Sequence, residues 1–198
     1  MRIKTDARRQ AILEVATELF REVGYERATM ANISRRLGGS KATLYSYFKS
    51  KEELFAAAMQ DAMLEQADEV MALLDPSQSD VRAVLSCFGE AYLRLVTTSD
   101  ALSIIRTAVA EGNNSGLGEE LYELGPQQGW HRMGDYIALL MERGILQPAN
   151  HRIAAVHLKG LLEAGILEPL LFGAKPAFAE AEVVEAAVDI FLRAYSVR

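Results

Sequence analysis

Side chains suited to catalysis or metal binding are few in this sequence, and their spacing favours neither activity. None of the three histidines has metal-ligand spacing with carboxylates or with the single cysteine, Cys87; they are His131, His151 and His157. No glycine-rich loop of the phosphate-cradling kind is present. Cys87 excludes an internal disulfide, and its position near Leu85 and Phe88 favours packing in the core. We therefore expect no enzyme, no metal site and no cofactor.

The charged side chains are divided unevenly along the chain. Residues 1–51 hold eleven Lys or Arg and five Asp or Glu, a net charge of +6. Residues 52–198 hold ten and twenty-two, a net charge of −12. A basic end on an acidic body suits a protein whose one end meets nucleic-acid phosphates. A solvated basic face would have the same charge, so the choice depends on the elements that carry these residues.

Helical periodicity dominates the sequence, and no strand-like alternation persists, which predicts an all-α protein of about nine helices. The first helix has an apolar stripe that runs from Ile12 to Val23 and is followed by Gly24, a residue suited to the position after a helix end. Thr29 caps a short second helix that ends at Gly38-Gly39.

Ser40 caps a third short helix, on which Leu44 and Phe48 face inward. Ser50 and Glu53 form a capping box that opens a fourth helix, and Asp75-Pro76 ends it. Two short helices joined by a glycine turn and supported by a longer helix match the helix-turn-helix, in which the second of the pair enters the major groove. Periodicity alone leaves an ordinary helical hairpin open.

Three sequence stretches decide between these alternatives: ATMANI at 28–33, Leu37-Gly38, and TLYSYFKSKEEL at 43–54. They closely resemble the signature of the TetR family of transcription regulators, over roughly residues 8–55. The resemblance implies a helix-turn-helix DNA-binding domain at 1–53 and an effector-binding and dimerisation domain at 54–198.

The same resemblance implies DNA-binding roles residue by residue. Hydroxyls at helix starts meet phosphates, three residues of the third helix face base edges, and two tyrosines and a lysine meet the DNA backbone; these are Thr29, Ser40, Lys41, Ala42, Thr43, Tyr45, Tyr47 and Lys51. A hydroxyl at a helix N-terminus suits a phosphate oxygen because unpaired N–H groups point there. Capping alone, or packing of a tyrosine beside Phe48 on the first helix, are the simpler readings.

Beyond Pro76 the chain stays helical, with breaks at 97–99, 112–116, 125–126, 144–148 and 173–176 that divide about five further helices. The family resemblance places a ligand among the fourth to seventh helices, which gives the candidate lining Met63, Phe88, Tyr92, Arg106, Trp130 and Met133. Plain core packing is the alternative for the apolar members, and a surface pair with Glu111 for Arg106. Residues 104–111 and 144–146 are similar to the AcrR-like efflux-regulating branch, which hints at a hydrophobic effector.

The last two predicted helices, 150–172 and 178–195, are apolar around much of their girth. Pairing with their copies across a two-fold axis would bury that surface in a homodimer, as the resemblance implies. Burial within one chain is the competing interpretation. A dimer matters because two recognition helices set one DNA turn or a multiple apart read a palindrome.

These observations predict a sequence-specific regulator, a repressor released from a palindromic operator by a small hydrophobic effector; activation is also open. The alternative is a helical DNA-binding or interaction protein that answers to a protein partner. The charged stretch Met1–Gln10 and the lack of an apolar run near ~18 residues predict a cytoplasmic protein without a membrane segment.

Overall fold

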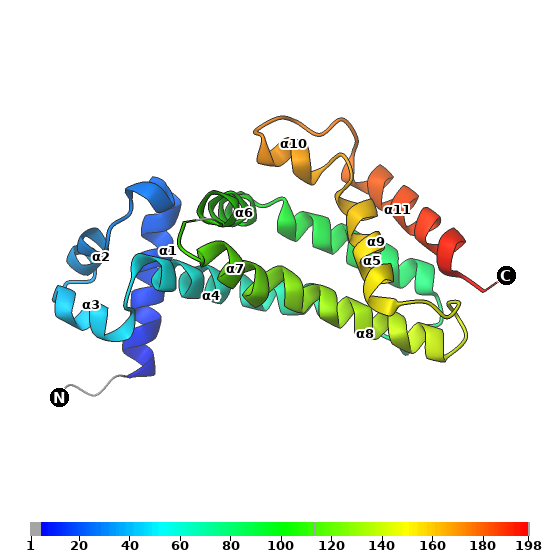
Figure 1. Ribbon diagram of the computed structural model, residues 1–198, viewed down its shortest axis with the longest axis horizontal. Helices are drawn as coiled ribbons and strands as arrows, with labels where there is room; N and C mark the ends of the chain where they lie inside the picture. Colours follow the sequence, from blue (N-terminus) through cyan, green and yellow to red (C-terminus); the bar gives the residue numbers. More distant parts are fainter. Residues whose placement is uncertain (1–4, 113, 198) are drawn as a thin grey trace. The chain divides into compact units, whose positions relative to one another are not determined.

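The computed structural model describes residues 5–112 and 114–197, so the first part of the charged N-terminal stretch lies outside the described residues. Within them the fold is all-α (Figure 1), and nine of its α-helices have seven or more residues, as predicted. No helix in the described ranges is long and apolar enough to cross a membrane. In chain order the elements are α1 (Asp6–Arg27), α2 (Met30–Arg36), α3 (Lys41–Tyr47), α4 (Lys51–Ala72), α5 (Val81–Val96), α6 (Ser99–Glu111), α7 (Leu117–Tyr122), the π-helix η1 (Glu123–Gln127), α8 (Gln128–Glu142), α9 (His151–Glu163), α10 (Leu167–Leu171) and α11 (Glu180–Tyr195).

The chain forms two compact units. The first contains residues 1–65 and 103–124, and the second contains residues 66–102 and 125–198. These units are defined by packing, whereas the predicted boundary at 53/54 divides functions. One boundary between the two units therefore lies within α4, and α7 belongs to the first unit.

The core of the first unit is built on the buried stripe of α1. Ile12, Leu13 and Ala16 are fully buried there, and the Phe55 ring meets the rings of Phe20 and Tyr25 edge to face in the same core. Gly24 has a φ of +79° and interrupts α1 near its end, as its position in the sequence predicts. Figure 1 shows α2 beside both α1 and α3, and these contacts hold the helix pair on the core.

The core of the second unit lies among α5, α8, α9 and α11. α8 packs against α9, and α11 packs against both α9 and α5. The stripes that meet there are apolar at helical spacing, and Phe88, Met133, Ile137 and Phe191 are completely buried. Phe88 and Met133, two of the candidate ligand residues, are therefore part of this core.

Three details differ from the sequence-based expectations. The predicted helix 150–172 is interrupted, because Gly165 adopts a φ of +73° between α9 and α10. The predicted break at Gly125-Pro126 is a π-helical turn, η1, that joins α7 to α8. Cys87 is exposed, because it lies on the face of α5 opposite the buried stripe that contains Leu85 and Phe88.

Candidate nucleic-acid interface

Hydrogen bonds fix the start of α2 and the turn that joins α2 to α3. The Thr29 hydroxyl accepts a hydrogen bond from the backbone N–H of Asn32 (3.2 Å), and this caps α2. Ser34 donates its hydroxyl proton to the carbonyl oxygen of Gly39 (2.9 Å) across the turn. Gly38 has a φ of +67°, a conformation that glycine adopts without steric cost. The turn thereby sets the direction in which α3 leaves α2.

The third helix is anchored by one face and exposes the other. Leu44 is fully buried and Phe48 nearly so, whereas Lys41, Ala42 and Tyr45 are exposed. An exposed helix face of this kind is what a recognition helix needs in order to enter the major groove. The predicted base-reading Lys41 and Ala42 therefore lie together on the exposed surface of α3.

The hydroxyls at the start of α3 are engaged with each other. Ser40 Oγ accepts from the backbone N–H of Thr43 (3.1 Å) and lies 3.0 Å from Thr43 Oγ1. Thr43 is half-buried, so it is less accessible than Lys41. For Thr43 to contact a base, its hydroxyl must give up the hydrogen bond with Ser40 and bond to the base edge instead.

Tyr47 and Lys51, both predicted to meet the DNA backbone, also hold the unit together. The Tyr47 hydroxyl accepts a hydrogen bond from the backbone N–H of Thr5 (3.0 Å), which starts α1. The Lys51 ammonium donates to the carbonyl oxygen of Tyr25 (3.1 Å) and lies 3.9 Å from the centre of the Tyr25 ring. These contacts position both side chains where α1 meets α3 and α4.

The N-terminus of α4 carries the predicted capping contact in a modified form. The backbone N–H of Glu53 donates to the Ser50 hydroxyl (3.2 Å). The Glu53 carboxylate accepts from the backbone N–H of Lys49 (2.6 Å), one residue before the position that an ideal capping box uses. Both contacts fix the chain where it leaves α3.

Sequence reasoning missed arginines that the fold brings near the same helices. The exposed Arg35 of α2 donates to Asn32 Oδ1 (2.6 Å), and the Arg9 guanidinium lies 5.4 Å from the centre of the Phe48 ring. Arg36 instead pairs with Glu22 (2.6 Å), and the hydrogen bond from this guanidinium lowers the pKa of the carboxyl. The basic excess of residues 1–51 was the signal for these residues, but it did not show which cations were already paired.

The predicted ligand residues are divided between the two units. Phe88, Tyr92 and Trp130 form an aromatic cluster in the core of the second unit, with centroids 5.2–6.3 Å apart, and Met133 is buried in the same core. Met63 and Arg106 belong to the first unit. The Tyr92 hydroxyl donates to Glu163, and burial together with the Glu163 charge raises the pKa of Tyr92 well above its usual range.

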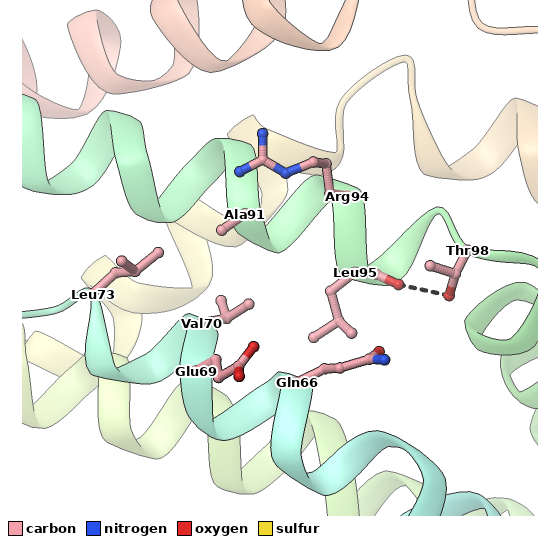
Figure 2. A pocket seen from close by; sticks show the side chains of 8 residues that line it. All are labelled: Gln66, Glu69, Val70, Leu73, Ala91, Arg94, Leu95 and Thr98. Atoms are coloured by element: carbon pink, nitrogen blue, oxygen red, sulfur yellow. Dashed lines mark hydrogen bonds between the residues drawn. The ribbon is translucent and has the colours of Figure 1, made fainter.

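A cleft in the second unit is lined by other residues (Figure 2). Its volume is about 420 Å³, and its walls come from the last turns of α4 and of α5, extending to Thr98 just beyond α5. It is lined by Gln66, Glu69, Val70, Leu73, Ala91, Arg94, Leu95 and Thr98. The sequence shows which residues are apolar but not where two helices diverge, so it did not predict this cleft.

Comparisons with known proteins agree with this geometry. Residues 12–58 match the family described as bacterial regulatory proteins, tetR family, and residues 83–197 match the AefR-like transcriptional repressor, C-terminal domain. The solved structure of a TetR-family regulator from Mesorhizobium loti MAFF303099 superposes with a TM-score of 0.86 over 98% of this chain and 100% of that chain, at 24% identity, which shows the shared fold. None of these matches singles out the efflux-regulating branch.

Curated relatives match only part of the chain. The uncharacterized HTH-type regulator YhgD of Bacillus subtilis (strain 168) is 36% identical over 81 residues, 39% of this chain and 42% of that protein. The nicotine-responsive repressor HdnoR of Paenarthrobacter nicotinovorans is 32% identical over 105 residues, 53% of each protein. The chain thus spans about half the length of these relatives or less.

The two family matches are to transcriptional regulators and not to enzymes, and the C-terminal one covers more than half of the chain. This chain therefore belongs to the TetR family of DNA-binding transcriptional regulators.

Proposed function

We propose that this regulator is a dimeric repressor that binds a palindromic operator through α3 and is released by a small apolar effector. The observation that carries the proposal is the exposed face of α3, where Lys41, Ala42 and Tyr45 project from a helix anchored by Leu44 and Phe48. A lysine at this position suits guanine O6 and N7, and an alanine suits a thymine methyl group.

The other predicted contacts would position the helix on DNA without reading its sequence. We assign phosphate contacts to the hydroxyls of Thr29, Ser40, Tyr45 and Tyr47 and to the ammonium of Lys51, and an additional base contact to Thr43. Such contacts fix register and orientation, and they raise the affinity for every sequence alike. Since its target would be chromosomal DNA, we place the protein in the cytoplasm.

Exposed apolar side chains on α9 and α11 support the dimer. Ile153 and Val156 of α9 and Ile190 of α11 are each more than half exposed. The two helices are joined by a 2.6 Å hydrogen bond between His157 Nδ1 and the Tyr195 hydroxyl. Exposed apolar side chains on both helices favour an interaction surface here, and a second copy would bury them in a four-helix arrangement.

Release of the operator would follow from ligand binding to the second unit. The cleft between α4 and α5 is large enough for a small molecule. The buried Phe88, Tyr92, Trp130 and Met133 remain our prediction for a ligand that reaches further into the core. An effector that prefers the conformer with lower operator affinity shifts the population towards it, typically by 1–3 kcal/mol of coupling. Residues 83–197 match the C-terminal domain of an AefR-like transcriptional repressor, and this match supports repression over activation.

Selection from a random double-stranded DNA library tests the proposal. We expect the wild-type protein to enrich a palindrome. Lys41→Ala should lose discrimination at one base position per half-site, by a cost of about 1–3 kcal/mol, whereas Tyr45→Ala should weaken all sequences alike. Lys175→Ala, an exposed lysine between α10 and α11, is the matched control.

The possible outcomes separate the parts of the proposal. Enrichment of a single half-site would contradict the dimer. Loss of binding in Lys175→Ala equal to that in Lys41→Ala would contradict the role given to α3. Regulation by a protein partner would be indicated if no small molecule altered operator affinity.

A further inference from the structure

The cleft between α4 and α5 has an apolar floor. Val70 is buried and belongs to the core of the second unit, and Leu95 packs against that core. Leu73 and Ala91 continue the apolar surface along α4 and α5, and Figure 2 shows Val70 and Leu95 directed into the space between the two helices. Such a floor suits a short hydrocarbon body, which gains affinity from each methylene group that it removes from water.

Glu69 is the charged residue on the α4 wall of the cleft. Its carboxylate lies at the α4 side of the cleft near Gln66 (Figure 2), and among the described residues it has neither an ion-pair partner nor a hydrogen-bond donor. Arg94 also lines the cleft, but its guanidinium is directed away from α4, and its ion-pair partner is Glu90, at 3.8 Å. The unpaired charge that a ligand meets on α4 is therefore negative.

We propose that this cleft binds an organic cation with a short apolar body, whose ammonium group pairs with Glu69. The hydrocarbon part would lie on Val70, Ala91 and Leu95, and the ammonium would also reach the amide oxygen of Gln66. The net charge of −12 on residues 52–198 attracts cations to this part of the chain and repels anions. The proposal rests on the proposed function, because it names the class of effector that acts at this site.

Three probes of equal chain length test the assignment: hexylammonium, 1-hexanol and hexanoate. Binding to the full chain is measured by calorimetry at neutral pH. We expect hexylammonium to bind about fivefold more tightly than 1-hexanol, because a solvent-accessible ion pair changes an affinity by about that factor. Hexanoate should bind most weakly. In Glu69→Gln the preference for the cation over the alcohol should disappear.

Two further variants keep the test specific to the cleft. Glu65→Gln removes an equivalent exposed carboxylate from the same helix outside the cleft and should leave all three affinities unchanged. Ala91→Leu fills the floor and should weaken all three probes together. Equal binding of hexanoate and hexylammonium, or an unchanged cation preference in Glu69→Gln, would overturn the assignment.

Operator binding is then measured with and without hexylammonium. If the cation binds through Glu69 and operator affinity falls, both proposals stand. If it binds and operator affinity is unchanged, the cation site stands and effector-controlled release fails. If the operator is bound but the cation is not, the cation assignment alone fails.

Discussion

At the scale of single residues, Tyr92 shows how a polar group is kept in the core of the second unit. Its ring stacks on Phe88 and meets Trp130 edge to face, and its hydroxyl donates to Glu163. Lys159 pairs with the other oxygen of the same carboxylate at 2.5 Å. The phenol is therefore held neutral between an apolar cluster and a negative charge, and its pKa is raised.

The raised pKa of Tyr92 predicts a loss of stability at alkaline pH. An unfolded tyrosine has a pKa of about 10, so the stability contributed by the buried neutral phenol is complete below pH 10. It is lost as the pH rises from 10 towards the higher folded-state pKa. Urea unfolding between pH 8 and pH 11 should show a shallower decline in Tyr92→Phe than in the wild-type protein. The exposed Tyr122→Phe should keep the wild-type slope, and a similar decline in all three proteins would exclude Tyr92 as the cause.

The residue types predicted part of the candidate site. Lys41, Ala42 and Tyr45 could be placed on the outer face of α3 because Leu44 and Phe48 define its inner face at helical spacing. The contact of Lys51 with Tyr25 could not, because it joins residues 26 positions apart through tertiary packing. Cys87 was misplaced because apolar neighbours in sequence do not share its helix face.

At the scale of elements, the backbone of the α2–α3 turn depends on a single left-handed residue. Gly38 has a φ of +67°, whereas the adjacent Gly39 does not adopt a positive φ. Side chains with a Cβ are disfavoured in the left-handed region by about 1–2 kcal/mol. The spacing of caps and glycines made this turn predictable, whereas the interruption of the 150–172 segment at Gly165 was not, because glycine within a helical pattern also permits close packing.

We expect Gly38→Ala to destabilise the protein by about 1 kcal/mol in urea unfolding and to weaken operator binding. Gly39→Ala is the control, since its added methyl group would lie 2.9 Å from the end of the flexible Arg8 side chain and at an ordinary contact distance of 3.9 Å from Leu37. The expected order is wild type, then Gly39→Ala, then Gly38→Ala. Equal costs for the two alanines would show that the positive φ is not what stabilises the turn.

At the scale of the whole molecule, function requires two copies of the chain if the operator is a palindrome. The exposed Val156 lies on α9 within the proposed interface, whereas Val109 on α6 is still more exposed and belongs to the first unit. A buried glutamate in an apolar interface has no partner for its charge, which opposes association. The two valines therefore allow the same substitution to be compared inside and outside the interface.

We expect Val156→Glu to sediment as a monomer and to lose most of its operator affinity, because the two half-sites no longer bind as a linked pair. Val109→Glu should remain a dimer with unchanged affinity. Analytical ultracentrifugation gives the oligomeric state, and fluorescence anisotropy gives the affinity. A dimeric Val156→Glu would place the interface on another face.

The core of the first unit includes residues far along the chain, and this has a consequence for how such proteins can recombine. Leu117 and Leu121 of α7 are buried in that core, with Ile104 and Ala108 packed against it. An exchange of residues 1–53 between two relatives would join a foreign helix-turn-helix to an α7 shaped for a different core. A functional chimaera would have to carry residues 103–124 with residues 1–65, two separate pieces of coding sequence. A single crossover therefore cannot move the DNA-binding unit intact, and we expect changes at the proposed operator and effector sites to arise through point substitutions on α3 and in the cleft.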